Sequence, residues 1–365
     1  MKAVDHVLMK IEEGGILSLP QDTCITNTTK RTPILLRMIV VVFAMLFGMY
    51  ICFICLKQTR THLNPKYILL EQKIQVSTEQ CQVSSTQAAE GLLFHYPKPK
   101  TYSRDECICN PVRLFAILSM QRSGSGWFET FLNSHLNVSS NGEIFSVMER
   151  RNNISSVLNT LEKVYNLDWF SSAAKNECSA AVGFKWMLNQ GVLDYHKEIV
   201  EYFNWRGVSA IFLLRKNLLR RAISIMANSY DRDAKLLNGT HKSHVHSQTE
   251  AKVLAQYKPV INVTLLLPDL ERAEEMAVNG LEYFKSTRHI IVYYEDLVSN
   301  RTKLMDVQEF LRLPQRSLHS HQVKIHTKPL SQLVANWDDV YKALKDTKYS
   351  CFLEESDYPS NSTFI

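Results

Sequence analysis

The sequence lacks the compositional marks of a fibrous, disordered or disulfide-built protein. Its 12 Gly and 11 Pro follow no collagen-like period, and 8 Cys in 365 residues are too few for a disulfide-built miniprotein. It also lacks dense basic runs, since 42 Lys and Arg stand against 36 Asp and Glu. The net charge of +6 allows an anionic partner, but the charge pattern does not indicate a nucleic-acid binder. With 45% hydrophobic residues, the fold must rest on a hydrophobic core.

One long apolar run lies near the N-terminus. Residues 38–56 are nineteen in a row without a charge, enough at ~1.5 Å per helical residue to span a hydrocarbon core of roughly 30 Å. A cleaved signal peptide would begin nearer Met1 and end at small residues, whereas this run ends at Cys55 and Leu56. A buried core helix is disfavoured because every face would be apolar. The run therefore predicts a transmembrane helix.

Basic residues flank this run almost equally and do not decide its orientation. Asn-X-Ser/Thr sequons are unequal: one, at Asn27, precedes the run, and six follow it, at Asn137, Asn153, Asn238, Asn262, Asn300 and Asn361. This asymmetry predicts a single-pass type II protein with a glycosylated lumenal part. We expect a cytoplasmic tail over 1–37, the membrane helix over 38–56, a polar stem over 57–106 and a lumenal domain over 107–365.

Five cysteines would then be lumenal, namely Cys81, Cys107, Cys109, Cys178 and Cys351. One or two disulfides are expected among them, and their pairing cannot be read from the sequence. The odd number leaves a thiol over, or pairs it between the two chains of a homodimer.

Apolar strand-like runs alternate with helical patterns beyond the stem. The runs cover 112–118, 180–188, 208–214 and 289–294. Continuous apolar strands separated by amphipathic helices predict an α/β fold with a parallel sheet covered on both faces. Ligands of such sheets bind at the carboxyl ends of the strands, so the residues that follow Leu118 and Leu214 are the first candidates for a site.

A tight turn follows the first predicted strand. The segment from Ser119 to Trp127 is rich in Ser and Gly and leads into a helix, so its backbone N–H groups can cradle a phosphate. It is not a Walker A loop, because GxxxxGK[ST] is absent; the cationic side chain comes earlier, from Arg122. After the third predicted strand, Arg215 and Ser224 could clasp a second phosphate, which alone is a weak signal.

Three motifs in this order are similar to those of sulfotransferases that use 3′-phosphoadenosine-5′-phosphosulfate (PAPS). Arg122–Trp127 resembles their 5′-phosphosulfate loop, Arg215 with Ser224 resembles their 3′-phosphate segment, and the run from Tyr294 to Leu297 resembles their YEDL. The likeness covers about residues 107–350. It is nearest to the membrane-bound carbohydrate and protein-tyrosine sulfotransferases and to nodulation-protein-H-like members. It implies a P-loop-NTPase-like α/β fold, PAPS as co-substrate and a Golgi membrane location.

The resemblance also implies residue roles. Arg122 would act on the sulfonate and its bridging oxygen, and Glu143, at about the family's distance beyond this cation, would be the general base. The other cofactor contacts would come from Ser123, Gly124, Ser125, Gly126, Trp127, Arg215 and Ser224. Glu129 and Glu149 are the next carboxylates to test as base. No metal is required.

The chain departs from the family pattern in places. Ser224 lies one residue farther from Arg215 than is usual, and Lys216-Asn217-Leu218 replaces a common Pro, so the local turn must differ. Ser125-Gly126 stands where a pair of hydroxyl residues is common, which removes one side-chain contact to the phosphate.

Three further groups of residues are weaker candidates. Lys185 could be another cation over the sulfonate, and Thr327 with Lys328 could form a late loop that closes over the cofactor. The residues His241, His244 and His246 have spacings that a metal site could use, but they lie in a polar stretch and are interpreted as a flexible surface loop.

Two other classes of function stay open. A type II Golgi glycosyltransferase would share the anchor and the sequons, and Asp231-Arg232-Asp233 supplies the Asp-X-Asp pattern that could hold a metal and a nucleotide sugar. A non-catalytic binding protein could keep the same fold. The acceptor of a sulfotransferase is expected to be a hydroxyl of a glycan or glycoconjugate, although the sequence does not separate a glycan from a tyrosine or a small metabolite.

Overall fold

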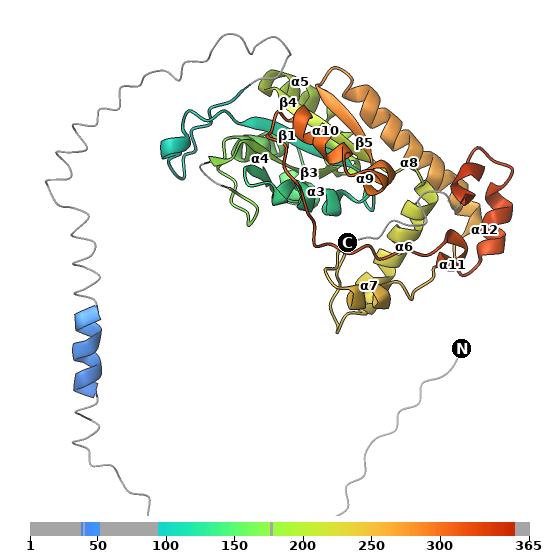
Figure 1. The fold of residues 1–365 in the computed structure, drawn as a ribbon, viewed down its shortest axis with the longest axis horizontal. Coiled ribbons are helices and arrows are strands. Elements are labelled where there is room, and N and C mark those ends of the chain that lie inside the picture. Colours follow the sequence, from blue (N-terminus) through green and yellow to red (C-terminus); the bar gives the residue numbers. More distant parts are fainter. Residues whose placement is uncertain (1–37, 39–40, 52–93, 176–177, 355–365) are drawn as a thin grey trace, which may run out of the picture. The chain divides into compact units, whose positions relative to one another are not determined.

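The computed structural model describes residues 38, 41–51, 94–175 and 178–354, and the chain divides into two units, Met1–Gln80 and Cys81–Ile365 (Figure 1). In the first unit, residues 41–51 are helical and their large apolar side chains are exposed. Within the described residues, no helix is both long and apolar enough to span a bilayer. The predicted transmembrane helix over 38–56 lies partly outside those residues and stays a prediction, as does the tail over 1–37.

The second unit is built on a parallel sheet. Its strands are β1 (Arg113–Ser119), β2 (Val138–Ser140), β3 (Ala181–Met187), β4 (Val208–Leu214) and β5 (His289–Tyr293). They lie in the order β2-β3-β1-β4-β5, and every neighbouring pair is parallel. The four predicted apolar strands are confirmed. The sequence analysis missed β2, whose three residues Val-Ser-Ser are too short and too polar for a periodicity signal.

Helices cover both faces of the sheet, as predicted. Alternate residues of β1 show this, because Leu114, Ala116 and Leu118 join one buried cluster and Phe115 and Ile117 join another. On the first face pack α4 (Ile154–Tyr165), α5 (His196–Arg206), α8 (Val263–Tyr283) and α12 (Trp337–Leu344). On the second face pack α3 (Ser125–Ser134), α9 (Tyr294–Ser299) and α10 (Lys303–Phe310).

A smaller apolar cluster lies beyond α6 (Leu218–Ala234). It joins Leu237 and Val245 to residues of α7 (Gln248–Leu254), and Val323 and Ile325 pack against it. Val245 and Val323 also form an isolated antiparallel bridge, in which Val323 N donates to Val245 O at 2.9 Å. The segment that carries the three predicted loop histidines is therefore anchored to the chain near residue 323.

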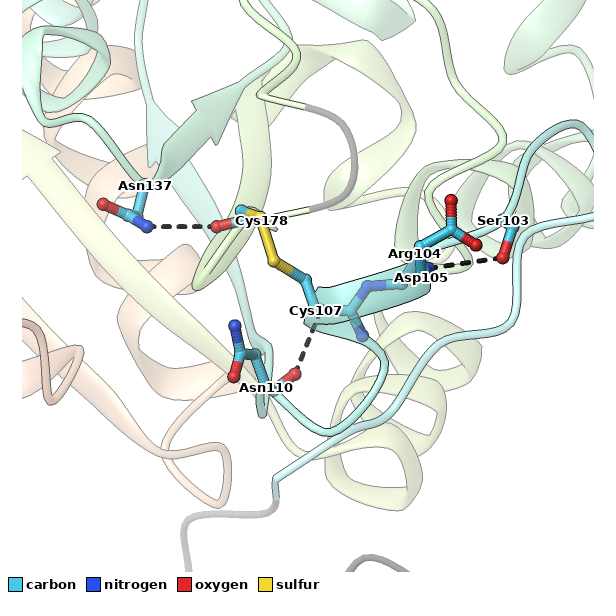
Figure 2. The surroundings of a disulfide bond; sticks show 7 residues. All are labelled: Ser103, Arg104, Asp105, Cys107, Asn110, Asn137 and Cys178. Carbon is cyan, nitrogen blue, oxygen red and sulfur yellow. Dashed lines mark hydrogen bonds between the residues drawn. A yellow bond between two sulfur atoms is a disulfide. The ribbon is translucent and has the colours of Figure 1, made fainter. Parts of the chain in front are cut away.

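A disulfide joins Cys107 to Cys178 (Figure 2). Cys107 precedes β1 in the sequence and Cys178 precedes β3, and these two strands are neighbours in the sheet. Asn137, which precedes β2, donates from Nδ2 to the Cys178 carbonyl oxygen at 3.1 Å. Cys109 is also disulfide-bonded, and Cys351 is an exposed free thiol. The expectation of one or two disulfides and a leftover thiol agrees with this arrangement.

Residues 94–106, which the sequence analysis assigned to the stem, pack against the α/β unit. His95 exchanges backbone hydrogen bonds with Val112, at 3.0 and 2.8 Å. Asp168 Oδ1 accepts from the backbone N of Lys100 at 2.7 Å and of Thr101 at 3.1 Å. The rest of the predicted stem, residues 57–93, lies outside the described residues.

Candidate functional site

A cavity of about 970 Å³ opens at the carboxyl ends of β1, β3 and β4. Among the described residues that line it, six are Lys or Arg, namely Arg122, Lys185, Arg215, Arg232, Arg301 and Lys324. One carboxylate, that of Glu143, belongs to the same lining. A cavity with this balance of charge favours an anionic ligand.

The predicted phosphate loop forms one wall of the cavity. Arg122 and Gly124 both have left-handed backbone, with φ of 65° and 82°. At Gly124 a Cβ atom would lie 2.3 Å from the Tyr294 ring, so only glycine fits there. Gly124 is also the N-cap of α3, and no side chain caps this helix. The first amides of α3 are therefore available to an anion in the cavity.

Three of the loop residues, Ser125, Gly126 and Trp127, line the cavity with Gly124, as predicted for a phosphate loop. Ser123 does not line it: its side chain is fully buried, and its Oγ makes no hydrogen bond with any described residue. The Trp127 ring packs edge-on against Tyr294, with ring centroids 5.6 Å apart.

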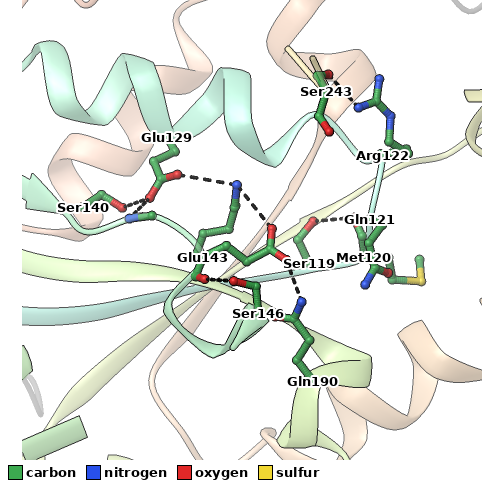
Figure 3. A network of polar contacts seen from close by, with 12 residues as sticks. Ser119, Met120, Gln121, Arg122, Glu129, Ser140, Glu143, Ser146, Gln190 and Ser243 are labelled. Atoms are coloured by element: carbon green, nitrogen blue, oxygen red, sulfur yellow. Dashed lines mark hydrogen bonds and ion pairs between the residues drawn. The ribbon is translucent and has the colours of Figure 1, made fainter. Parts of the chain in front are cut away.

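Arg122, Arg215 and Ser224, which were predicted as cofactor contacts, come together from three elements. The Arg122 guanidinium donates from Nε to Ser224 Oγ at 2.9 Å and from Nη1 to the Ser243 carbonyl oxygen at 2.8 Å. Arg215 donates from Nη1 to the Arg122 carbonyl oxygen at 3.1 Å. Burial, and then the charge of Arg215, lower the pKa of Arg122 to about 10, so the Arg122 guanidinium still carries its charge at neutral pH. Figure 3 shows the Arg122 side chain turned toward Ser243.

The third predicted motif, Tyr294–Leu297, contacts the Arg215 side chain. Glu295 is buried and places Oε1 3.6 Å from Arg215 Nε, while its Oε2 accepts from Lys216 N at 2.9 Å. The Arg215 guanidinium also lies over the Tyr294 ring, 5.3 Å from its centroid. The turn without proline is completed by Asn217, which caps α6 by accepting from Arg220 N at 3.0 Å.

Glu143 and Lys185 form the opposite wall. Glu143 Oε1 accepts from Gln190 Nε2 at 2.6 Å, and its Oε2 lies 3.6 Å from Lys185 Nζ. Lys185, at the end of β3, is buried and also lies 3.7 Å from Glu129 Oε2. Glu129 and Glu143, both labelled in Figure 3, therefore each form an ion pair with Lys185.

The two alternative carboxylates occupy different positions. Glu129 is buried in α3, where Oε1 accepts from Ser140 Oγ at 2.6 Å and from Gly142 N at 2.9 Å, so it fixes the residue next to Glu143. Glu149 is exposed, and it is not among the cavity residues. Of the late-loop candidates, Thr327 lines the cavity, whereas the Lys328 carbonyl oxygen accepts from Arg220 Nη1 at 3.3 Å.

The Asp-X-Asp pattern has a structural role instead. Asp231 is buried and accepts from His241 Nδ1 at 2.7 Å and from Leu236 N at 3.0 Å, whereas Asp233 is exposed. Across the part of the chain that the structure describes, no three His, Cys, Asp or Glu side chains gather as they would around a metal ion.

Two histidines of the cavity were not predicted as site residues. His244, which was interpreted as part of a flexible surface loop, lies against Gly126 of the phosphate loop. The Nδ1 atom of His326 is buried in the cavity lining and has no hydrogen-bond partner among the described residues. Partial desolvation, and then neighbouring cations led by Arg122, lower the pKa of each imidazole to about 4, although the His244 side chain is still partly exposed to solvent. Nothing in the local sequence pattern signals these contacts, because both residues reach the site through long loops.

Comparison with known proteins identifies a relative that the chain covers almost in full. The chain is 24% identical over 251 residues to Nodulation protein H of Rhizobium meliloti, which covers 67% of this chain and 96% of that protein. No protein-family model matches the sequence. Two solved structures are also similar: a sulfotransferase from Alicyclobacillus acidocaldarius (12% identical, 66% of this chain, 99% of that chain, TM-score 0.36) and the sulfotransferase domain from the curacin biosynthetic pathway (17%, 60%, 82%, TM-score 0.30).

Proposed function

We propose that this chain is a sulfotransferase, which transfers the sulfonate of PAPS to an acceptor hydroxyl of a glycan or glycoconjugate. We further propose that it works in the Golgi lumen as a single-pass type II membrane protein. The similarity to Nodulation protein H supports the family-level part of this proposal, since it extends over 251 residues. The co-substrate, the acceptor, the location and the residue roles are our own proposals.

One observation carries the proposal: a single cavity joins an uncapped helix start, the cluster of Arg122, Arg215 and Ser224, and the pair of Glu143 and Lys185. PAPS carries two phosphate groups and a sulfonate, so it needs two anion sites and a place for the acceptor. The residues fit this need. The α3 amides suit the 5′-phosphate, and the Arg215 and Ser224 side chains suit the 3′-phosphate. The buried Ser123 Oγ of the same loop has no hydrogen-bond partner among the described residues.

When bound, PAPS supplies a sulfonate whose bond to the 5′-phosphate oxygen breaks as a bond to the acceptor oxygen forms. Glu143 takes the acceptor proton at Oε2, because its Oε1 already accepts from Gln190. Arg122 neutralises the negative charge that grows on the bridging oxygen. Lys185 orients the Glu143 carboxylate through their 3.6 Å ion pair and adds positive charge beside the transferred group.

The glycosyltransferase alternative loses its main support, because Asp231 is already bound by His241 and Leu236 N. The non-catalytic alternative predicts no product. Expression of the full chain and of Glu143→Gln in the same cells, followed by mass spectrometry of glycans and glycoproteins, distinguishes these cases. We expect new sulfonated glycans only with the wild type. If expression of the wild type adds no sulfonated product, the proposed enzyme activity is wrong. If the added sulfonate is on tyrosine, the proposed acceptor is wrong.

Topology has its own test. The proposal expects glycosidase treatment of the membrane-expressed chain to raise its gel mobility, because six sequons follow residue 56. An unchanged mobility, together with digestion of the C-terminal part by protease added from the cytosolic side, would reverse the topology.

A further inference from the structure

The ring of His244 occupies the space in front of the phosphate loop at Gly126. A Cβ atom built on Gly126 would lie 2.4 Å from His244 Nε2 and 2.6 Å from its Cε1. No side chain could share this space with the ring in its present place. Gly126 is the second residue of α3, so the Nε2 edge of the ring lies beside the amides that start the helix.

The position of His244 is fixed from both sides. On one side, the Ser243 carbonyl oxygen accepts from Arg122 Nη1 at 2.8 Å. On the other, Val245 is buried and its carbonyl oxygen accepts from Val323 N at 2.9 Å. His241, which precedes His244 in the same segment, is held by the buried Asp231, with 2.7 Å between His241 Nδ1 and Asp231 Oδ2. The segment therefore presents His244 to the cavity in a defined place.

Both ring nitrogens of His244 can still form hydrogen bonds with a ligand. Neither ring nitrogen bonds to any residue that the structure describes, although the ring lines the cavity. Its charged surroundings come from Arg122 on the phosphate loop, Lys185 at the end of β3 and His246 on its own segment. A neutral imidazole in such a place offers one N–H donor without adding another positive charge.

We propose that His244 is an additional ligand-binding residue of this cavity, which donates a hydrogen bond from Nε2 to an oxygen of the phosphate or sulfonate group held at the start of α3. This inference rests on the proposed function, since it concerns the 5′ end of the same nucleotide. It assigns a role to a residue outside the three motifs. It also links the role of His244 to the glycine at position 126, because any side chain there would displace the ring.

Calorimetric titration of the full chain tests this inference with two probes. Adenosine 3′,5′-bisphosphate carries the 5′-phosphate, and adenosine 3′-monophosphate lacks it. We expect His244→Ala to bind the bisphosphate about tenfold to hundredfold more weakly, as for a lost hydrogen bond to a charged group, and to bind the monophosphate as the wild type does. His246→Ala is the matched control, because His246 is exposed, as His244 is, but is not among the cavity residues; it should bind both probes normally.

The contact with Gly126 supplies a second and independent test. Gly126→Ala should displace the ring and weaken bisphosphate binding as much as His244→Ala does, and the double variant should show no further loss. Gly126→Ser combined with His244→Ala should recover part of the affinity, because a hydroxyl then stands where Nε2 stood. The melting temperature of each variant without nucleotide controls for misfolding.

The outcomes separate the two proposals. If His244→Ala binds the bisphosphate as tightly as the wild type, or loses equal affinity for both probes, His244 does not contact the 5′-phosphate and the inference is wrong. Additive losses in the double variant would contradict it as well. A wild-type chain that binds neither probe would overturn the proposed function itself, and this inference with it.

Discussion

Glu143 is the residue on which the proposed chemistry depends most. It is the carboxylate among the described cavity residues, and its Oε2 faces Lys185 while Oε1 is held by Gln190. Glu143→Gln keeps the shape and the hydrogen bond to Gln190 in one amide orientation, but it cannot take a proton. Turnover should fall by about 10²–10⁴-fold, while the affinity for adenosine 3′,5′-bisphosphate stays unchanged.

Steady-state kinetics of sulfonate transfer from PAPS to an acceptor hydroxyl measure this, and Glu149→Gln is the matched control, since Glu149 is exposed outside the cavity. Near-normal turnover of Glu143→Gln would place the base elsewhere. Glu129 is then a poor substitute, because its carboxylate is buried and already accepts two hydrogen bonds.

Arg215 carries a prediction about binding. Its side chain supports the Arg122 backbone and is supported in turn by Glu295 and the Tyr294 ring. Arg215→Ala should weaken binding of adenosine 3′,5′-bisphosphate by about 1.5–3 kcal/mol, the usual worth of a hydrogen bond to a charged group. The variant should also lose its preference for the bisphosphate over adenosine 5′-monophosphate. If the preference survives intact, Arg215 does not bind the 3′-phosphate.

At the scale of elements, the turn between β1 and α3 depends on Gly124. Alanine there would have to adopt a φ of 82° and would place its Cβ 2.3 Å from the Tyr294 ring. Gly239 has a similar φ of 76° with nothing within 4 Å, so Gly239→Ala measures the backbone strain alone, about 1–2 kcal/mol. Urea unfolding should show a larger loss for Gly124→Ala than for Gly239→Ala. Equal losses would mean that the Tyr294 contact does not constrain the loop.

The elements that the sequence predicts well are those with a strong local signal. The strands β1, β3, β4 and β5 are continuous apolar runs, and the phosphate loop is marked by its own Ser and Gly residues. The short polar β2 has no such signal. The contact between His244 and Gly126 has none either, because it joins residues 118 positions apart through a tertiary anchor at Val245 and Val323. The packing of 94–106 was missed for the same reason.

At the scale of the whole molecule, three histidines with a strongly lowered pKa make stability depend on pH. Burial is the first cause that lowers the pKa of His95, His244 and His326 to about 4, against an ordinary value of 6.5. Between these values the unfolded chain binds more protons than the folded one, so stability is lost as the pH falls from about 6.5 to about 4. Carboxylates with lowered pKa, such as Glu274, contribute only nearer the lower end of this range.

The melting temperature should therefore fall between pH 7.5 and pH 5, and His95→Gln, which lies outside the cavity, should fall less steeply. Bound adenosine 3′,5′-bisphosphate should reduce the loss, because its negative charge favours protonated His244 and His326. A melting temperature that is constant or higher at pH 5 would contradict the assignment of neutral, low-pKa histidines.

The most direct test of the central claim is nucleotide selectivity of the full-length chain in detergent. Its melting temperature is measured with adenosine 3′,5′-bisphosphate, and separately with a nucleoside diphosphate and manganese, at equal concentrations. The account predicts a rise with the bisphosphate alone, smaller in Arg215→Ala than in the wild type, because the cavity pairs a helix start with a second cationic site. A rise with the diphosphate and manganese alone, or with neither, would contradict it.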